Sequence, residues 1–304
     1  MDGPDAQIII EKAIQPSLSN MAAIRGGVEV VYTPQGALRN GASGWCIMIE
    51  DLVASRRLIW LLVCRDITVR YRQSILGYLW AVVPQIATVA AFAYLHAAKV
   101  LPMGGTKIPY VAYTVWGISV WQLFAASLSA CTSSLASSGS LVTKVNCQRE
   151  TLVIAALGQP GFDFLLRLVP VVAVFAWYGI SPAWTVVFVP FVLSAILLLA
   201  LGLGFVLSIT NLVIRDTGNA LGTMLTLGMF LTPVLYPAPV RWPYSLVNFL
   251  NPLSPLLTAS HDFIAVGTLT SPGMFALAWI FSLFLALAGW RAFRITIPRV
   301  AAYA

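Results

Sequence analysis

Six long runs of apolar residues, separated by short polar segments, dominate the chain from residue 76 onward. A helix needs about 20 apolar residues to cross roughly 30 Å of hydrocarbon, and its backbone polar groups must be paired within the segment. We therefore predict an all-α polytopic membrane protein with six transmembrane helices. The predicted spans are 76–98, 108–128, 152–178, 184–209, 220–236 and 274–290.

The segment between the fifth and sixth predicted spans differs, because prolines interrupt it and its apolar pieces are short. Two such pieces, 244–250 and 256–266, are separated by the sequence Asn-Pro-Leu-Ser-Pro at 251–255. Neither piece is long enough to cross a bilayer. We predict re-entrant half-helices over 243–267, and the alternative is one poor span with a loop.

Before the first predicted span, charged, glycine and apolar residues are mixed. We expect residues 1–50 to form a poorly ordered cytoplasmic extension and residues 51–75 to form an interfacial amphipathic helix region. Residues 58–64 are apolar on all sides, so two helical pieces with a bend fit better than one ideal amphipathic helix. The transmembrane domain is expected at 76–298, followed by a cytoplasmic tail at 299–304.

Composition supports a membrane protein, because 59% of the residues are hydrophobic and only 10% are charged. A soluble domain carries about 25% charged residues. The net charge of +7 does not indicate nucleic-acid binding, since the basic residues lie beside apolar runs and form no continuous basic face. The predicted outer loops hold only Lys99, Lys107 and Arg241, so the positive-inside rule places both termini in the cytoplasm.

Ionisable residues are scarce within the predicted spans. Asp163 and Arg167 lie four residues apart in the third span, share a helix face and can form a structural ion pair. An ion-coupled carrier usually has several buried ionisable groups along its path, so this class is poorly supported. The cysteines form no Cys-x-x-Cys pair, and no metal site is predicted.

No P-loop of the form Gly-x-x-x-x-Gly-Lys-Ser/Thr occurs in the sequence. ATP-driven transport would therefore need a second subunit that binds ATP and Mg, and no cofactor is expected on this chain. The predicted inner loop between spans two and three has apolar residues at helical spacing with charged flanks, which suits docking into a partner's groove. The candidate ATPase-coupling residues are Leu141, Val142, Lys144, Val145, Arg149 and Glu150.

Aromatic residues in spans one, two and five are candidates for lining a path, because sugar rings stack on aromatic faces. The alternative is ordinary packing or an interfacial aromatic belt. The candidate channel aromatics are Trp80, Trp116, Trp121, Phe124, Phe230 and Tyr236. The spacing of Gly218 and Gly222 at the start of span five permits close helix approach.

Five motifs occur in a fixed order along the chain. They are Arg65-Asp66-Ile67-Thr68-Val69-Arg70-Tyr71-Arg72-Gln73 with Leu76-Gly77, Leu141-Val142-Thr143-Lys144-Val145 with Arg149-Glu150, Val213-Ile214-Arg215-Asp216, Thr232-Pro233-Val234-Leu235-Tyr236-Pro237, and Asn251-Pro252-Leu253-Ser254-Pro255. Over about residues 52–298 this set resembles the permease subunit of type-2 ATP-binding-cassette (ABC-2) exporters of lipid-linked polysaccharide, above all O-antigen. One departure is Cys147-Gln148, where the family usually has an aromatic-Pro pair.

The resemblance implies a homodimer with two copies of an ABC ATPase, in the inner membrane of a bacterium. The substrate would be an undecaprenyl-pyrophosphate-linked glycan that passes through a channel at the homodimer interface. Arg215 and Asp216 would form a cytoplasmic structural pair. The residues implied where the substrate enters are Arg65, Asp66, Arg70, Tyr71, Arg72, Leu76 and Gly77.

Other functions stay open at this point. Within the same family, the alternative substrates are teichoic acid, capsule or another molecule, because exporters of all of these share the motifs. Outside it, the alternatives are an ion-coupled flippase and a membrane-embedded glycosyl- or acyltransferase, which needs an acid/base pair or a nucleophile. Asp66 and Asp216 each follow an arginine, which indicates structural pairing rather than catalysis.

Overall fold

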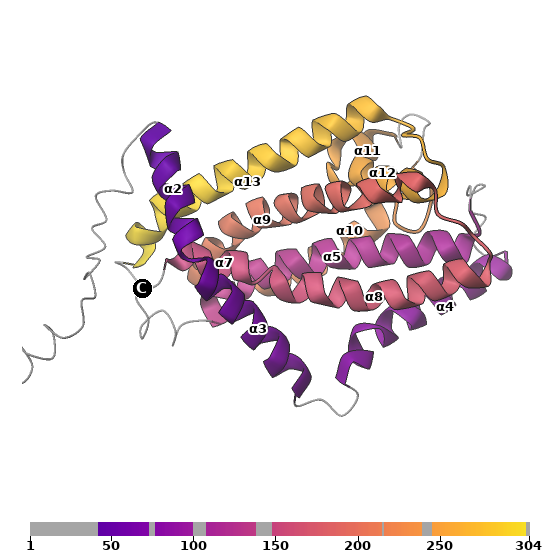
Figure 1. Ribbon diagram of the computed structural model, residues 1–304, viewed down its shortest axis with the longest axis horizontal. Helices are drawn as coiled ribbons and strands as arrows, with labels where there is room; N and C mark the ends of the chain where they lie inside the picture. The colour runs from indigo at the N-terminus through magenta and orange to yellow at the C-terminus, as the bar shows by residue number, and fades with distance from the viewer. Residues whose placement is uncertain are drawn as a thin grey trace, which may run out of the picture. The chain divides into compact units, whose positions relative to one another are not determined.

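A computed structural model describes residues 42–72, 77–99, 108–137, 148–214, 216–238 and 245–301, all of which belong to one compact unit, Asn40–Ala304 (Figure 1). Every element within these residues is helical, which confirms the all-α prediction for this part of the chain. The elements are α2 (Ala42–Ala54), α3 (Arg56–Arg72), η2 (Gly77–Ala81), α4 (Val83–Ala97), α5 (Tyr110–Ser137), α7 (Arg149–Ala155), α8 (Gly158–Trp177), η3 (Trp184–Phe188), α9 (Val189–Val213), α10 (Thr217–Leu231), α11 (Ser245–Leu250), α12 (Leu253–Ala265) and α13 (Pro272–Ala301).

Four helical segments are long and apolar enough to cross a membrane: Tyr110–Ser137, Arg149–Trp177, Trp184–Val213 and Pro272–Ile297. They correspond to predicted spans two, three, four and six. The other two predicted spans contain α4 and α10, each of 15 residues. At 1.5 Å per residue, 15 residues reach only about 22 Å. The crossing of the membrane at spans one and five therefore stays a prediction.

The helix boundaries follow local sequence signals. Pro84 occupies the first turn of α4. The backbone N–H groups there have no carbonyl partner within the helix, so a proline costs no hydrogen bond. Pro160 lies in the first turn of α8 for the same reason, and a short turn at 156–157 separates α8 from α7. The third predicted span is thus two helices in sequence rather than one.

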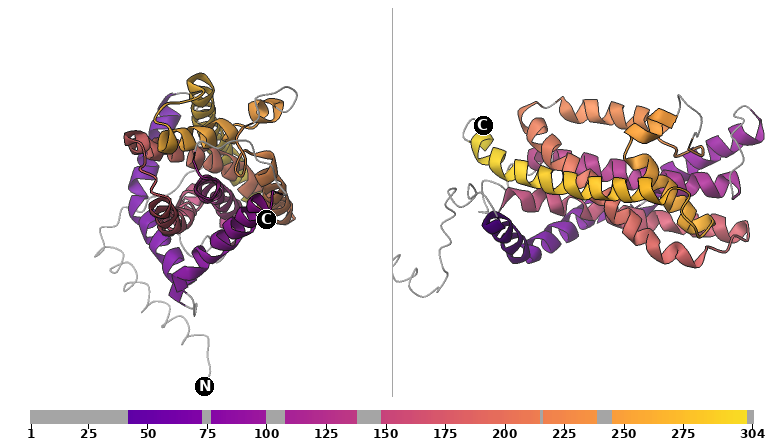
Figure 2. Two further views of the ribbon diagram at one scale, coloured as in Figure 1. Left: turned by 90° about the vertical axis from the view of Figure 1, so that its right-hand side faces the viewer. Right: turned by 90° about the horizontal axis from the view of Figure 1, so that it is seen from above.

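Helix α9 lies between α5 and α13 in the centre of the fold (Figures 1 and 2). The backbones of α9 and α13 meet at two glycines, because a Cβ on Gly202 would lie 2.6 Å from the carbonyl carbon of Leu285. A Cβ on Gly289 would overlap the carbonyl oxygen of Gly202. Small residues of this kind allow close helix packing in membranes.

This contact gives a first prediction. Alanine in place of Gly289 should destabilise the protein by ~1–3 kcal/mol, because the new methyl group meets backbone that cannot move aside cheaply. The matched control is Gly273→Ala, since a Cβ at Gly273 in the same helix meets nothing within 4 Å. Thermal unfolding of the purified protein in detergent measures both variants. Equal midpoints for the two would contradict the packing argument.

The N-terminal helical region begins earlier than expected. Helix α2 starts at Ala42, and Met48 is fully buried in a cluster with Phe293 of α13. Residues 42–50 are therefore helical and packed on α13, although they fall within the extension predicted at 1–50. Residues 1–41 lie outside the described residues. Within the predicted region 51–75 the structure has the end of α2 and one uninterrupted helix, α3, with the break between them at Ser55.

Two short helices follow α10, as the apolar pattern indicated. The side chain of Asn251 defines the start of α12, because its Oδ1 accepts a hydrogen bond from the N–H of Leu253 at 3.0 Å. Its Nδ2 donates to Oγ1 of Thr232 at 2.8 Å. The re-entrant path of α11 and α12 through a membrane stays a prediction. Helix α13 continues to Ala301, beyond the predicted end of span six and into the predicted tail.

Candidate functional site

A cluster of charged and aromatic side chains lies where the end of α3 packs on the start of α8. A Cβ on Gly158 would overlap the side chain of Val63, so the two helices are in close contact there. The hydroxyl of Tyr71 donates a hydrogen bond to Oδ1 of the buried Asp163. Nη1 of Arg70 lies 3.8 Å from Oδ2 of the same carboxylate. Burial, and then the adjacent Asp163, raises the pKa of Tyr71 well above its usual range, so the hydroxyl remains a donor.

Arg167 contributes a second guanidinium group from α8. Its Nε donates to the carbonyl oxygen of Ala81 at 3.2 Å, and the side chain is 7% exposed. Nη1 of Arg167 is buried and has no hydrogen-bond partner in the part of the chain that the structure describes. The predicted Asp163–Arg167 ion pair is absent among the described contacts, because Tyr71 and Arg70 from α3 occupy the carboxylate instead.

Gln159 and three aromatic rings complete this region. In the amide orientation that satisfies both partners, the side-chain oxygen of Gln159 accepts a hydrogen bond from Nε of Arg70 at 2.9 Å. The ring of Tyr71 lies 4.6 Å from that of Tyr78 and 5.9 Å from that of Phe162, measured between centroids. The aromatic rings thus form a platform beside the charges. We name Arg70, Tyr71, Gln159, Asp163 and Arg167 the α3–α8 cluster.

The other residues that the family resemblance placed at the substrate entrance lie in different surroundings. Arg65 and Asp66 pair with each other, Nη2 to Oδ1 at 2.7 Å, at a partly exposed position. Arg72 is exposed, and Gly77 begins η2 with a φ of 49°. Leu76 lies outside the described residues. Asp216 is exposed, but Arg215 is outside the described residues, so their pairing stays a prediction.

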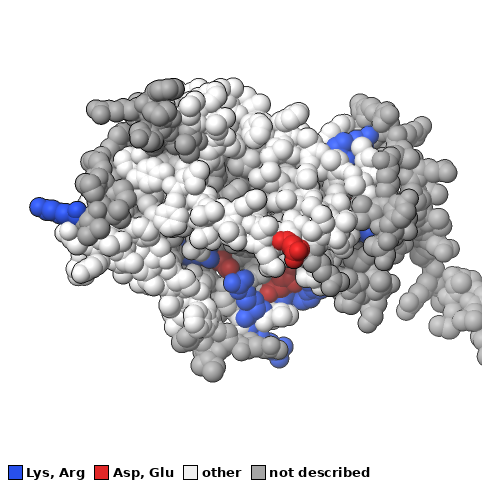
Figure 3. Space-filling view, turned by 180° about the vertical axis from the view of Figure 1, so that it is seen from behind, with Lys and Arg blue, Asp and Glu red and all other residues white. Residues whose placement is uncertain are grey.

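The space-filling view shows how strongly the charges are localised (Figure 3). Most of the described surface in this view is uncharged; the visible acidic side chains gather with several basic ones in one area near the lower edge, and further basic side chains lie at the left edge and at the upper right. An uncharged surface of this kind suits contact with lipid, and a localised group of ionisable residues in a membrane protein points to function. The sequence favoured a structural ion pair of Asp163 and Arg167 over an ion-coupling site, and the rarity of ionisable residues in an apolar span was the available signal of function.

The six candidate channel aromatics fall into two groups. Trp116, Trp121 and Phe124 are buried within the chain, where Trp116 donates from Nε1 to Oγ of Ser260 at 3.0 Å. Their rings pack inside the single chain, and a role in lining a channel stays a prediction. Trp80 and Phe230 are exposed. The half-buried Tyr236 lies next to Phe230 and donates from its hydroxyl to the carbonyl oxygen of Phe230 at 2.8 Å.

The candidate coupling residues Leu141, Val142, Lys144 and Val145 lie outside the described residues, and Arg149 is half-buried at the start of α7. Glu150 is 4% exposed, and it accepts hydrogen bonds from Nε1 of Trp290 at 2.6 Å and from Nη1 of Arg294 at 3.5 Å. Arg294 also pairs with Asp51. These residues join α2, α7 and α13, and we name Asp51, Glu150, Trp290 and Arg294 the α2–α7–α13 network.

The sequence is similar to one protein family and to several proteins of known name. Residues 57–264 match the family described as ABC-2 type transporter. The chain is 29% identical over 215 residues to the O-antigen export system permease protein RfbA of Myxococcus xanthus, which covers 70% of this chain and 82% of that protein. Two proteins of the same name from Klebsiella pneumoniae are 27% and 24% identical, with the same coverage.

Proposed function

Because this chain belongs to the ABC-2 type transporter family, we propose that it is the transmembrane subunit of an ATP-driven exporter of undecaprenyl-linked polysaccharide. O-antigen is the proposed polysaccharide. The observation that carries this proposal is the similarity, over 70% of the chain, to three proteins named as O-antigen export permeases. ATP and Mg would bind to a separate ABC ATPase subunit, present in two copies beside a homodimer of this chain.

The α3–α8 cluster supports a site for the pyrophosphate of the lipid carrier. A buried phosphate needs cationic hydrogen-bond donors, and guanidinium groups provide them in paired geometry. Arg167 has a buried Nη1 without a partner among the described residues, and Arg70 lies beside it across Asp163. Bonds from Tyr71 and Arg70 hold the Asp163 carboxylate in place, which orients Arg70 rather than leaving a free anion to repel phosphate. The exposed ring of Tyr78 would stack against the first sugar.

One face of α10 supports the position of the channel. Asn219, Thr223 and Thr226 are exposed and share a helix face at spacings of four and three residues. An exposed amide is costly in hydrocarbon, so this face suits a water-filled path better than lipid. A Cβ on Gly222 would meet nothing within 4 Å, which leaves room for a second copy of the chain. We place Trp80, Phe230 and Tyr236 along the same path as stacking residues.

We also propose six crossings, with both termini in the cytoplasm of a bacterial inner membrane, and the length of the first span supports the crossing there. Helix η2 leads into α4 after one residue, and a 3₁₀ helix rises about 2 Å per residue. The five residues of η2 at that rise add about 10 Å to the roughly 22 Å of α4, and the sum reaches the roughly 30 Å of the hydrocarbon core. The first span is then a bent pair of helices rather than one straight helix.

Force from the ATPase would enter at the loop that precedes α7. The buried Glu150 lies directly after this loop and is bonded to α13, so it is placed to pass movement on rather than to touch the ATPase itself. Through Arg294 the same movement reaches α2 at Asp51. We retain Leu141, Val142, Lys144, Val145 and Arg149 as the proposed ATPase contacts.

The proposal is tested by deleting the gene in its own bacterium and purifying tagged protein in mild detergent. We expect loss of surface polysaccharide, accumulation of lipid-linked glycan inside the cell, and a near-equal amount of a P-loop ATPase in the purified sample. ATP hydrolysis by the complex should fall when Lys144 and Arg149 are changed to alanine. The control is Arg57→Ala, an exposed arginine at the start of α3. A chain that purifies alone, with unchanged surface polysaccharide, would refute the proposal, and the identity of the accumulated glycan separates O-antigen from teichoic acid or capsule.

A further inference from the structure

Two buried polar atoms on neighbouring helices lack a hydrogen-bond partner among the described residues. One is a donor, Nη1 of Arg167 in α8, and the other is an acceptor, Oε1 of Gln85 in α4. Both side chains are buried. Buried polar atoms without a partner are rare, because each costs about 1–3 kcal/mol. A donor and an acceptor that both lack a partner indicate a site that one small polar molecule would satisfy.

The backbone brings these two side chains into the same region. Nε of Arg167 donates to the carbonyl oxygen of Ala81 at the end of η2, at 3.2 Å. Gln85 follows Ala81 by four residues, about one helical turn, and both are buried on the same side. Side chains lean toward the N-terminus of their helix, so the amide of Gln85 points back toward the turn that Arg167 contacts.

The orientation of the Gln85 amide follows from its partners on α5. Nε2 of Gln85 lies 2.7 Å from Oγ of Ser119 and 3.3 Å from the carbonyl oxygen of Val115. The hydroxyl of Ser119 already donates to the carbonyl oxygen of Val115 at 2.6 Å, so both atoms that face Gln85 are acceptors. The amide nitrogen must therefore face α5, which leaves Oε1 for a partner outside α5.

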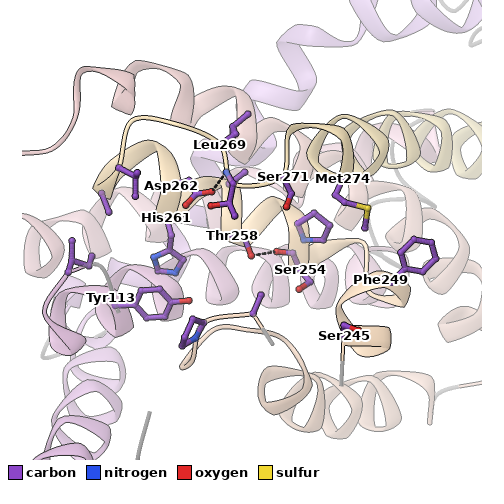
Figure 4. A pocket seen from close by; sticks show the side chains of 18 of the residues that line it. Tyr113, Ser245, Phe249, Ser254, Thr258, His261, Asp262, Leu269, Ser271 and Met274 are labelled. Atoms are coloured by element: carbon purple, nitrogen blue, oxygen red, sulfur yellow. Dashed lines mark hydrogen bonds between the residues drawn. The ribbon is translucent and has the colours of Figure 1, made fainter. Parts of the chain in front are cut away.

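Helix α5 is held on α12 by residues next to those that bind Gln85. Nε1 of Trp116 donates to Oγ of Ser260 at 3.0 Å. One turn earlier, the ring of Tyr113 stacks on that of His261 with centroids 3.9 Å apart, beside a cavity of about 730 Å³ (Figure 4). These contacts fix the part of α5 to which the Gln85 amide is bonded.

We propose that Gln85 limits the affinity of Arg167 for the carrier phosphate, which rests on the phosphate site proposed above for the α3–α8 cluster. In the unloaded exporter, one buried water accepts a hydrogen bond from Nη1 of Arg167 and donates one to Oε1 of Gln85. A phosphate oxygen that displaces this water accepts from Nη1 but has no proton to donate to Oε1. A ligand that displaces a bound water without replacing its hydrogen bonds loses affinity. Gln85 therefore keeps binding weak enough for the carrier to leave during transport.

Two variants of Gln85 should change phosphate binding in opposite directions. Gln85→Met removes Oε1 with little change in length, so the affinity for farnesyl diphosphate should rise about fivefold, the worth of one hydrogen bond. Gln85→Glu places a carboxylate beside Arg167 that competes with phosphate, so the affinity should fall at least about tenfold. Loss of folding would weaken binding in both variants, so it does not explain an increase.

The measurement is equilibrium binding of radiolabelled farnesyl diphosphate to the full-length chain in lipid nanodiscs. The matched control is Ser119→Ala, which removes one bond from Nε2 of Gln85, while the bond to Val115 still orients the amide. Its affinity should equal that of the wild type. Farnesol has the same chain without phosphate and should bind equally to every variant. Unchanged or weaker binding of the diphosphate by the Gln85→Met variant would overturn the proposal.

A variant of Arg167 separates this proposal from the phosphate site itself. In the Arg167→Gln background, Gln85→Met should have no effect, because Gln85 acts only through Arg167. If Arg167→Gln weakens binding but both Gln85 variants bind like the wild type, the phosphate site stands and the role of Gln85 is refuted. A wild-type chain that does not bind farnesyl diphosphate would refute both.

Discussion

Changing Arg70 and Arg167 together to glutamine is expected to reduce export of the lipid-linked glycan by at least about a hundredfold. A hydrogen bond to a charged group contributes about 1.5–3 kcal/mol, and the double change removes two guanidinium donors from one phosphate site. Glutamine keeps much of the side-chain length, and the bond from Tyr71 to Asp163 remains in the variant. The double change also removes the cations beside the buried Asp163 carboxylate, which costs stability, so the loss is assigned to binding only at equal abundance of protein in the membrane.

The measurement is surface glycan in cells whose only copy of the gene is the variant, with the amount of protein in the membrane checked in parallel. The control is the pair Arg56→Gln and Arg57→Gln, which removes the same charge from exposed positions at the start of α3. We expect this control to export normally. Normal export by the Arg70 and Arg167 variant at equal membrane abundance would show that the α3–α8 cluster does not hold the carrier phosphate.

The second large effect concerns the stability of the α2–α7–α13 network. Methionine in place of Arg294 should destabilise the protein by about 3–5 kcal/mol, because it leaves the buried Glu150 carboxylate without its cation. Glu150→Gln should restore part of the loss in the Arg294→Met background, since it removes the uncompensated charge while keeping an acceptor for Nε1 of Trp290.

Thermal unfolding of the four proteins of this double-mutant cycle measures the coupling between Glu150 and Arg294. The exposed Arg57 again provides the control, because Arg57→Met should change the midpoint little. Additive effects of the two network changes would show that the ion pair of 3.5 Å contributes no coupling energy. A strong coupling energy would support the proposal that Glu150 links the loop before α7 to helix α13.

The apolar runs of the sequence were sufficient to locate the long spans. Predicted spans two, three, four and six match helical segments that are long enough to cross, because about 20 apolar residues leave few other folds possible. The ends of these helices were less predictable. Helix α5 continues to Ser137, past the predicted end at 128, and α13 continues to Ala301. Polar residues tolerate helical conformation beyond the membrane, so hydropathy alone does not mark where a helix stops.

Side-chain partners were the least predictable part of the candidate site. Asp163 and Arg167 share a helix face, but the closest partners of Asp163 come from α3, more than 90 residues earlier in the chain. Only the packing of α3 on α8 determines this choice. The same limit applies to Trp116, Trp121 and Phe124, which composition marked as possible stacking residues and the fold buries. In a membrane protein, apolar residues face both lipid and core, so periodicity does not separate the two.

The glycine contacts of α9 distinguish the closely packed helices α5, α9 and α13 from the more peripheral ones. Backbone contact at Gly202 and Gly289 fixes α9 to α13, and a Cβ on Gly204 would overlap the side chain of Cys131, so α9 also packs closely on α5. Helices packed this closely should not slide past one another without separating. We expect α5, α9 and α13 to move as one body during a transport cycle. We therefore expect the larger movements of a transport cycle in the peripheral elements α3, α4 and α10, where no described glycine brings backbone against the backbone of another helix.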